Sequence, residues 1–143
     1  MATLDTAIRA SATALSAERA RIEVAVSNMA NAESTRGANG QPYRRRDVVL
    51  SSDPIESFDS ALGRAGAAMG VKVAGIVEDQ TPFKRRYDPA HPDADATGFV
   101  AYPNVDVPEQ VVDMMSASRA YQANLSAIGM IKDMVQRALE LGK

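Results

Sequence analysis

His91 is the chain's single histidine, and it lies among the carboxylates of Asp88, Asp93 and Asp95. Imidazole and carboxylate groups are common ligands of protein-bound metals. The alternative is a turn made rigid by two prolines, with its acids in water. No second histidine is present and no helix is expected here to fix the ligand geometry, so we prefer the turn and expect no metal.

Other catalytic chemistry has little support. The sequence contains no cysteine, which excludes disulfides and thiolate metal sites. With one histidine, most pairs of nucleophile and base are unavailable as well. Gly63, Gly66 and Gly70 are spaced wrongly for a dinucleotide fingerprint and follow no buried strand. We therefore predict that the protein is not an enzyme and binds no cofactor.

Two clusters of three bases each follow a proline and an aromatic residue, at 42–46 and 82–86. Basic side chains can bind the phosphates of a nucleic acid, and a neighbouring aromatic ring can stack on a nucleobase. Nucleic-acid binding through Arg44–Arg46 and Lys84–Arg86 is therefore one interpretation. Protection of strand edges, or contact with acidic neighbours, is the other. The net charge of −2 and the pI near 5.4 favour the second.

Charge is also segregated along the chain. Residues 1–46 contain seven Lys or Arg and four acids, whereas residues 87–113 contain six acids and no base. Such asymmetry suits docking between protein subunits better than nucleic-acid binding. We therefore expect no nucleic-acid partner.

Two helices are predicted, one from Leu4 to about Asn31 and one from Asp106 or Val107, as the cap, to a stop at Gly142. In each, apolar and small residues recur at alternating steps of four and three, the spacing of a coiled-coil seam, although Ser11 and Glu18 interrupt the first row. The first row consists of Leu4, Ile8, Ser11, Leu15, Glu18, Ile22, Ala25 and Met29. The second consists of Val111, Met114, Ser118, Tyr121, Leu125 and Ile128, and continues after a shift at Lys132 with Ile131, Val135, Ala138 and Leu139.

The middle of the chain has a different pattern. Glycine and proline concentrate there, and alternating apolar residues predict strands at 43–50, 70–77 and 98–102. We interpret residues 51–69 as a mobile loop with at most a helical turn. The predicted fold class is mainly α with a small β insertion, the long N- and C-terminal helices pairing as a coiled-coil-like bundle around it. The expected divisions are 1–34, 35–105 and 106–143, with the two helices as one structural unit.

Alanine supplies much of the apolar content of both helices, so each contact contributes little hydrophobic stabilisation. Helices of this kind become stable when many pack together. From these patterns alone, the function can be predicted only as far as a coiled-coil interaction protein. No stretch approaches the ~20 apolar residues of a membrane span, and the first residues lack the features of a cleaved signal peptide.

Two terminal motifs resemble the signatures of the flagellar axial superfamily, which comprises rod, hook and filament-junction proteins. The first is Val26–Gly37, in which a helix leads into an Asn-x-x-Asn element formed by Asn28 and Asn31. Their amides lie on one face and can cap the helix end or bridge to another chain. The second is Tyr102–Asp106 followed by Ser116–Asn124. The middle region, from Pro42 to Pro92, is most similar to the short proximal rod members.

The resemblance implies a structural rod subunit that polymerises through its terminal helices into the torque-transmitting shaft. It implies export by the flagellar type III apparatus without a cleaved signal, and a place in the basal body, in the rod spanning the periplasm. The implied partners are further copies, other rod proteins, and the base and ring proteins of the basal body, with no direct membrane insertion. We expect the assembly contacts at Leu4, Ile8, Leu15, Ile22, Asn28, Asn31, Asn104, Val111, Met114, Tyr121, Asn124, Leu125 and Ile128.

A second hypothesis remains open on the sequence alone. A cytoplasmic helical-hairpin adaptor or export chaperone would show similar apolar rows and would bind partner helices without polymerising. Cellular location discriminates between the two, because an adaptor stays inside the cell and a rod subunit is exported.

Overall fold

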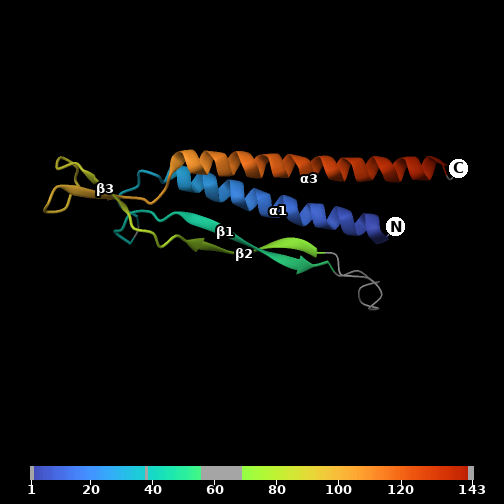
Figure 1. Ribbon diagram of the computed structural model, residues 1–143, viewed down its shortest axis with the longest axis horizontal. Helices are drawn as coiled ribbons and strands as arrows, with labels where there is room; N and C mark the ends of the chain where they lie inside the picture. The colour runs from blue at the N-terminus through green and yellow to red at the C-terminus, as the bar shows by residue number, and fades with distance from the viewer. Residues whose placement is uncertain (1, 38, 56–68, 142–143) are drawn as a thin grey trace. The chain divides into compact units, whose positions relative to one another are not determined.

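The computed structural model describes residues 2–37, 39–55 and 69–141 of the 143-residue chain. Along these residues the order is helix α1 (Ala2–Ala30), strands β1 (Arg46–Pro54), β2 (Met69–Glu78), β3 (Lys84–Tyr87) and β4 (Phe99–Tyr102), and helix α3 (Val107–Leu141). Two long helices therefore flank a small β region of two antiparallel sheets, which confirms the predicted fold class (Figure 1). The Gly63–Gly66 motif, most of the expected 51–69 loop and the stop at Gly142 lie outside the described residues.

Helix α1 agrees with its predicted row. Every residue of the row is buried or half-buried, and the exposed residues form a separate row with the same alternation of four and three. The exposed row is Asp5, Arg9, Ala12, Ser16, Arg19, Glu23, Val26 and Ala30. The segregation of two faces is what an amphipathic helix requires.

Helix α3 departs from its predicted row. Met114, Tyr121 and Ile128 are half-buried as expected, but Val111 and Leu125 are exposed. The less exposed row keeps the four-three rhythm without any shift, and it runs through Gln110, Met114, Ala117, Tyr121, Asn124, Ile128, Ile131 and Val135. Gln110, Ala117 and Asn124 thus lie in this row at the turns where Val111, Ser118 and Leu125 were expected.

The strands differ from expectation mainly at their ends. The first was predicted at 43–50 but runs from Arg46 to Pro54, so residues 51–54 are strand and not loop. It begins three residues later than predicted, and at its start side-chain amides satisfy the backbone N–H groups of Arg45 and Arg46. β1 pairs with β2, and β3 pairs with β4 in antiparallel register from Lys84 opposite Tyr102 to Tyr87 opposite Phe99.

The chain divides into two compact units, one made of two segments and the other of three. The junction unit consists of Arg21–Val48 and Ile76–Met115. The helix-end unit consists of Met1–Ala20, Val49–Gly75 and Ser116–Lys143. The predicted divisions at 34/35 and 105/106 follow the sequence, whereas these units each draw on both helices and on the β region.

The junction unit has a small mixed core. Val100 and Pro103 are fully buried, and Ala25 and Val105 are nearly so. Asn28 and Gln110 are buried with them, at 0% and 2% exposure. Buried amides are costly unless their hydrogen bonds are made inside the protein, so their partners identify the most specific part of this unit.

The helix-end unit is held by small residues. Ala17 and Ala117 are buried, together with Ile55. The hydroxyl of Thr13 accepts a hydrogen bond from the backbone N–H of Val71 (3.2 Å). This close approach needs Gly70, because a Cβ at that position would lie 2.8 Å from the hydroxyl oxygen.

Candidate functional site

Asn28, in the last turn of α1, uses its full hydrogen-bonding capacity. Its Oδ1 accepts from the backbone N–H of Arg46 (3.0 Å) and from the hydroxyl of Tyr43 (2.9 Å). Its Nδ2 donates to the carbonyl of Arg46 (2.8 Å) and to Oε1 of Gln110 (2.8 Å). An asparagine amide has two donor hydrogens and two acceptor lone pairs, so all four are satisfied. This one side chain connects the end of α1, the start of β1 and the first turns of α3.

Asn104 performs a similar task from the segment before α3. Its Oδ1 accepts from the backbone N–H of Arg45 (2.8 Å), and its Nδ2 donates to the hydroxyl of Thr81 (2.8 Å) and the carbonyl of Asp79 (3.2 Å). Two asparagine side chains thus accept hydrogen bonds from the backbone N–H groups of consecutive residues, Arg45 and Arg46. In a sheet, those two N–H groups would need a neighbouring strand on each side.

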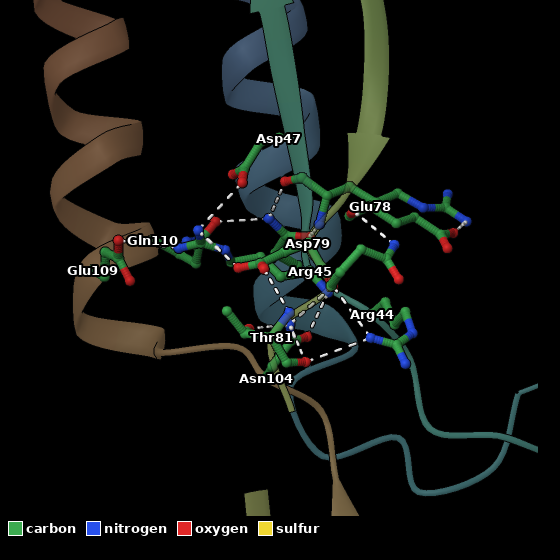
Figure 2. A network of polar contacts seen from close by, with 12 residues as sticks. Arg44, Arg45, Asp47, Glu78, Asp79, Thr81, Asn104, Glu109 and Gln110 are labelled. Atoms are coloured by element: carbon green, nitrogen blue, oxygen red, sulfur yellow. Dashed lines mark hydrogen bonds and ion pairs between the residues drawn. The ribbon is translucent and has the colours of Figure 1, made fainter. Parts of the chain in front are cut away.

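The guanidinium of Arg45 lies among three carboxylates (Figure 2). Its nitrogens are 3.2 Å from Asp47, 3.1 Å from Asp79 and 3.0 Å from Glu109. Burial lowers the pKa of Arg45, but the carboxylates of Asp47, Glu109 and Asp79 raise it further, so the net direction is upward. The cation is therefore permanent, and with the amide of Asn104 it fixes the start of β1 to the start of α3.

Asp79 has its pKa lowered from the ordinary value. The hydrogen bond from the backbone N–H of Thr81 (2.8 Å) is the largest cause, and the Thr81 hydroxyl and the nearby Arg45 act in the same direction. Asp95 has its pKa lowered by its hydrogen bonds with the Thr97 hydroxyl and the Phe99 backbone N–H. These carboxylates are structural acceptors that stay ionised at neutral pH.

Arg44 and Arg46, the other two bases of the first cluster, also have partners within the chain. The guanidinium of Arg44 lies over the ring of Phe83 at 4.3 Å and donates to the carbonyls of Asp79 and Thr81. Arg46 lies 3.4 Å from a carboxylate oxygen of Glu78. The first basic cluster thus contributes to the internal structure of the junction unit.

The second basic cluster, in β3, is engaged in the same way. Its contacts are Lys84 with the carbonyl of Val105 (2.8 Å), Arg85 with Asp95 (3.1 Å) and Arg86 with the ring of Tyr102 (4.0 Å). These contacts favour the structural interpretation of both clusters over nucleic-acid binding.

The expected turn around His91 is present. His91 Nδ1 accepts the backbone N–H of Asp93 (3.1 Å), while Asp93 accepts from the hydroxyl of Thr35 (2.8 Å) and pairs with Arg36 (3.0 Å). Asp95 pairs with Arg85 instead. Within the ranges that the structure describes, no group of three His, Cys, Asp or Glu residues is arranged to hold a metal ion.

The other asparagines proposed from the sequence have local roles. Asn31 donates to the carbonyl of Ser27 (2.8 Å), which caps the end of its own helix. Asn124 donates to the carbonyl of Ala120 (2.9 Å), one turn back in α3. Of the two roles considered for Asn28 and Asn31, capping fits Asn31, whereas Asn28 forms a bridge inside the chain.

Sequence reasoning missed Tyr43, Arg45, Asp79 and Gln110 as partners in this junction. Asn28 and Gln110 are 82 positions apart, so no local spacing connects them. One signal was present: Gln110 is a polar residue in line with Met114 and Ala117, on a face otherwise reserved for packing. A polar residue at such a position indicates a buried partner.

Family comparisons agree with this architecture. A family described as the C-terminal region of flagellar basal body rod FlgEFG proteins matches residues 96–141, which contain β4 and α3. Two terminal helices around a small β region, together with this match, define the class as a flagellar basal-body rod protein.

Curated relatives identify the family more closely. The chain is 47% identical over 130 residues to the flagellar basal-body rod protein FlgC of Salmonella typhimurium, covering 91% of each. It is 46% identical to FlgC of Bacillus subtilis, covering 95% of this chain and 96% of that one, and 39% identical to FlgC of Borreliella burgdorferi, covering 96% and 97%. The chain belongs to the FlgC family of flagellar basal-body rod proteins.

These findings favour a structural rod subunit over the adaptor hypothesis. Among the described residues, no helix is both long and apolar enough to cross a membrane.

Proposed function

We propose that the chain is incorporated into the flagellar rod by packing the uncovered faces of its terminal helices against neighbouring subunits. The observation that carries this proposal is the set of large apolar side chains that α3 leaves exposed. These are Val107, Val111, Val112, Met115, Leu125, Met130, Met134 and Leu139, with exposures that reach 65% at Val112 and 62% at Met130. Apolar surface on this scale is typical of an interface.

The two units would have different tasks in this assembly. The bridge at Asn28 and the ion pairs of Arg45 hold the base of the β region to both helices within the junction unit. The helices supply the surface for polymerisation, and the stiff shaft so formed would transmit torque without any catalytic step. Further copies, other rod proteins, and the base and rings of the basal body are the proposed partners. Export by the type III apparatus without a cleaved signal rests on the family resemblance.

Leu125→Asp tests this proposal, because Leu125 is 55% exposed and the isolated chain does not depend on it. We expect the free energy of unfolding to change by less than about 0.5 kcal/mol. The variant should nevertheless be missing from purified hook–basal bodies analysed by mass spectrometry, and the cells should not swim. Tyr121→Asp should also block assembly, but Tyr121 is half-buried, which makes a loss of stability harder to separate.

Leu125→Met is the matched control, since it keeps the site apolar with little change in volume. It should be incorporated normally. Normal motility with Leu125→Asp would contradict the proposal. An unaltered chain that is absent from basal bodies but abundant in the cytosol would reinstate the adaptor hypothesis.

A further inference from the structure

An arginine-lined hollow lies in the junction unit beside the polar bridge. It has a volume of about 410 Å³, and its lining includes Arg36, Arg44, Arg46, Tyr43, Asn31 and Glu78. We call it the arginine hollow. Three cations face one lining carboxylate, so the hollow carries a surplus of positive charge in a chain whose net charge is negative.

The three arginines retain donors for a further partner. Arg36 touches Asp93 through a single nitrogen, and its side chain is 71% exposed. Arg44 donates to two carbonyls and has no carboxylate partner among the described residues. Arg46 pairs with Glu78 through one nitrogen. A guanidinium has five N–H donors in a planar fork that fits a carboxylate, so this group is suited to bind acids.

Acids without partners lie in the same unit. Asp106 and Asp113 are exposed, and neither carboxylate has a partner among the residues that the structure describes. Asp106 directly precedes α3 and Asp113 follows seven positions later, close to two helical turns, which places them on one side of the helix. Val107 and Val112, beside them, are 42% and 65% exposed. Unpaired charge next to exposed apolar side chains is what a docking neighbour would cover.

We propose that the arginine hollow of one copy receives the acidic first turns of α3, with Asp106 and Asp113, from a second copy. This inference rests on the proposed function, because polymerisation brings copies together. In this arrangement, the basic excess of residues 1–46 and the acidic excess of residues 87–113 orient one subunit on the next. Each exposed pair is weak and salt-sensitive, so the contact sets register more than affinity.

The absence of cysteine from the sequence allows a clean cross-linking experiment. Two forms of the chain are expressed in one strain, one with Arg36→Cys and the other with Asp106→Cys. Isolated basal bodies are treated with a short bis-maleimide. Because the two thiols are on different molecules, a 36–106 linked peptide seen by mass spectrometry can come only from contact between copies. We expect that linked dimer, and we expect none when Asp133→Cys, another exposed acid of α3, replaces Asp106→Cys.

Charge reversal gives an independent result. Arg36→Glu should lower incorporation into basal bodies about tenfold, since it places like charges together. Combining it with Asp106→Arg should restore incorporation. Asp93→Asn removes the internal partner of Arg36 while leaving the arginine in place, and it should be incorporated normally.

The inference is overturned if both cysteine forms enter basal bodies without a 36–106 link and Arg36→Glu is incorporated normally. That result leaves the proposed function intact. If the unaltered chain is itself absent from basal bodies, the proposed function has failed, and the two failures are distinguishable.

Discussion

The junction unit and the helix-end unit are stabilised by different interactions. Buried amides and a cation with three carboxylates hold the first, and each of these groups needs partners in one geometry. Buried alanines, Ile55 and the close approach of Thr13 to Gly70 and Val71 hold the second, where each contact contributes little free energy. The comparison teaches that one end of the helices is specified within the monomer, whereas the other has less to specify it and more to gain from neighbours.

The largest expected effect comes from removing the bridge in the junction unit. Asn28→Ala leaves the N–H and carbonyl of Arg46 and Oε1 of Gln110 without their partner, and leaves the Tyr43 hydroxyl with its 3.4 Å contact to the Ser27 hydroxyl. Buried polar groups left unsatisfied cost about 1–3 kcal/mol each, so we expect a loss of about 3 kcal/mol or more in urea unfolding. The control is Asn31→Ala, which removes a local cap and should cost about 1 kcal/mol or less. Equal losses for both variants would contradict the bridge.

A smaller effect is expected in the helix-end unit from Gly70→Ala. The added Cβ would lie 2.8 Å from the Thr13 hydroxyl and 3.3 Å from Cγ1 of Ile55. We expect a loss of about 1–3 kcal/mol, measured by thermal or urea unfolding. Gly75→Ala is the matched control in the same strand, because its Cβ would meet nothing within 4 Å. That variant should be neutral or slightly stabilising, and an equal loss in both would indicate that the Thr13 contact is unimportant.

The smallest expected effect is on the pH dependence of the unfolding free energy, and it again differs between the two units. The pKa of Asp79 in the folded junction unit lies below its ordinary value. Its contribution is therefore fully present above the unfolded pKa of about 3.9 and is lost as pH falls through the lower folded pKa. We expect Asp79→Asn to flatten the acid limb of a plot of unfolding free energy against pH. Lys72–Asp53, an exposed pair in the helix-end unit, supplies the control: Asp53→Asn should leave the acid limb almost unchanged.

The sequence predicted the helices well, because alternating steps of four and three extend over many turns and leave little ambiguity. The less exposed row of α3 differs from the predicted row in its first turns. Gln110, Ala117 and Asn124 take the places predicted for Val111, Ser118 and Leu125, while Met114, Tyr121 and Ile128 belong to both rows. Val111 and Leu125 stay exposed in the isolated chain. Their place in an assembly interface is still a prediction.

The strand ends and the junction were harder to predict for a physical reason. The start of β1 is held by asparagine bonds at Arg45 and Arg46, and those bonds come from residues that are distant in sequence. Asn28, Asn31, Asn104 and Asn124 look alike as single letters, yet two form bridges and two bond to their own helix. Whether an asparagine bridges two segments or bonds to its own helix depends on its neighbours in three dimensions.

The side-chain amide of Asn28 forms hydrogen bonds with both the backbone N–H and the backbone carbonyl of Arg46. Recognition of this kind is indifferent to the side chain at position 46. These two hydrogen bonds therefore accept any residue at position 46 except proline, because proline has no N–H to offer. They accept no such range at position 28, where the side-chain amide itself forms both bonds. What holds residue 46 in place is thus separate from what its guanidinium does toward Glu78 and in the arginine hollow.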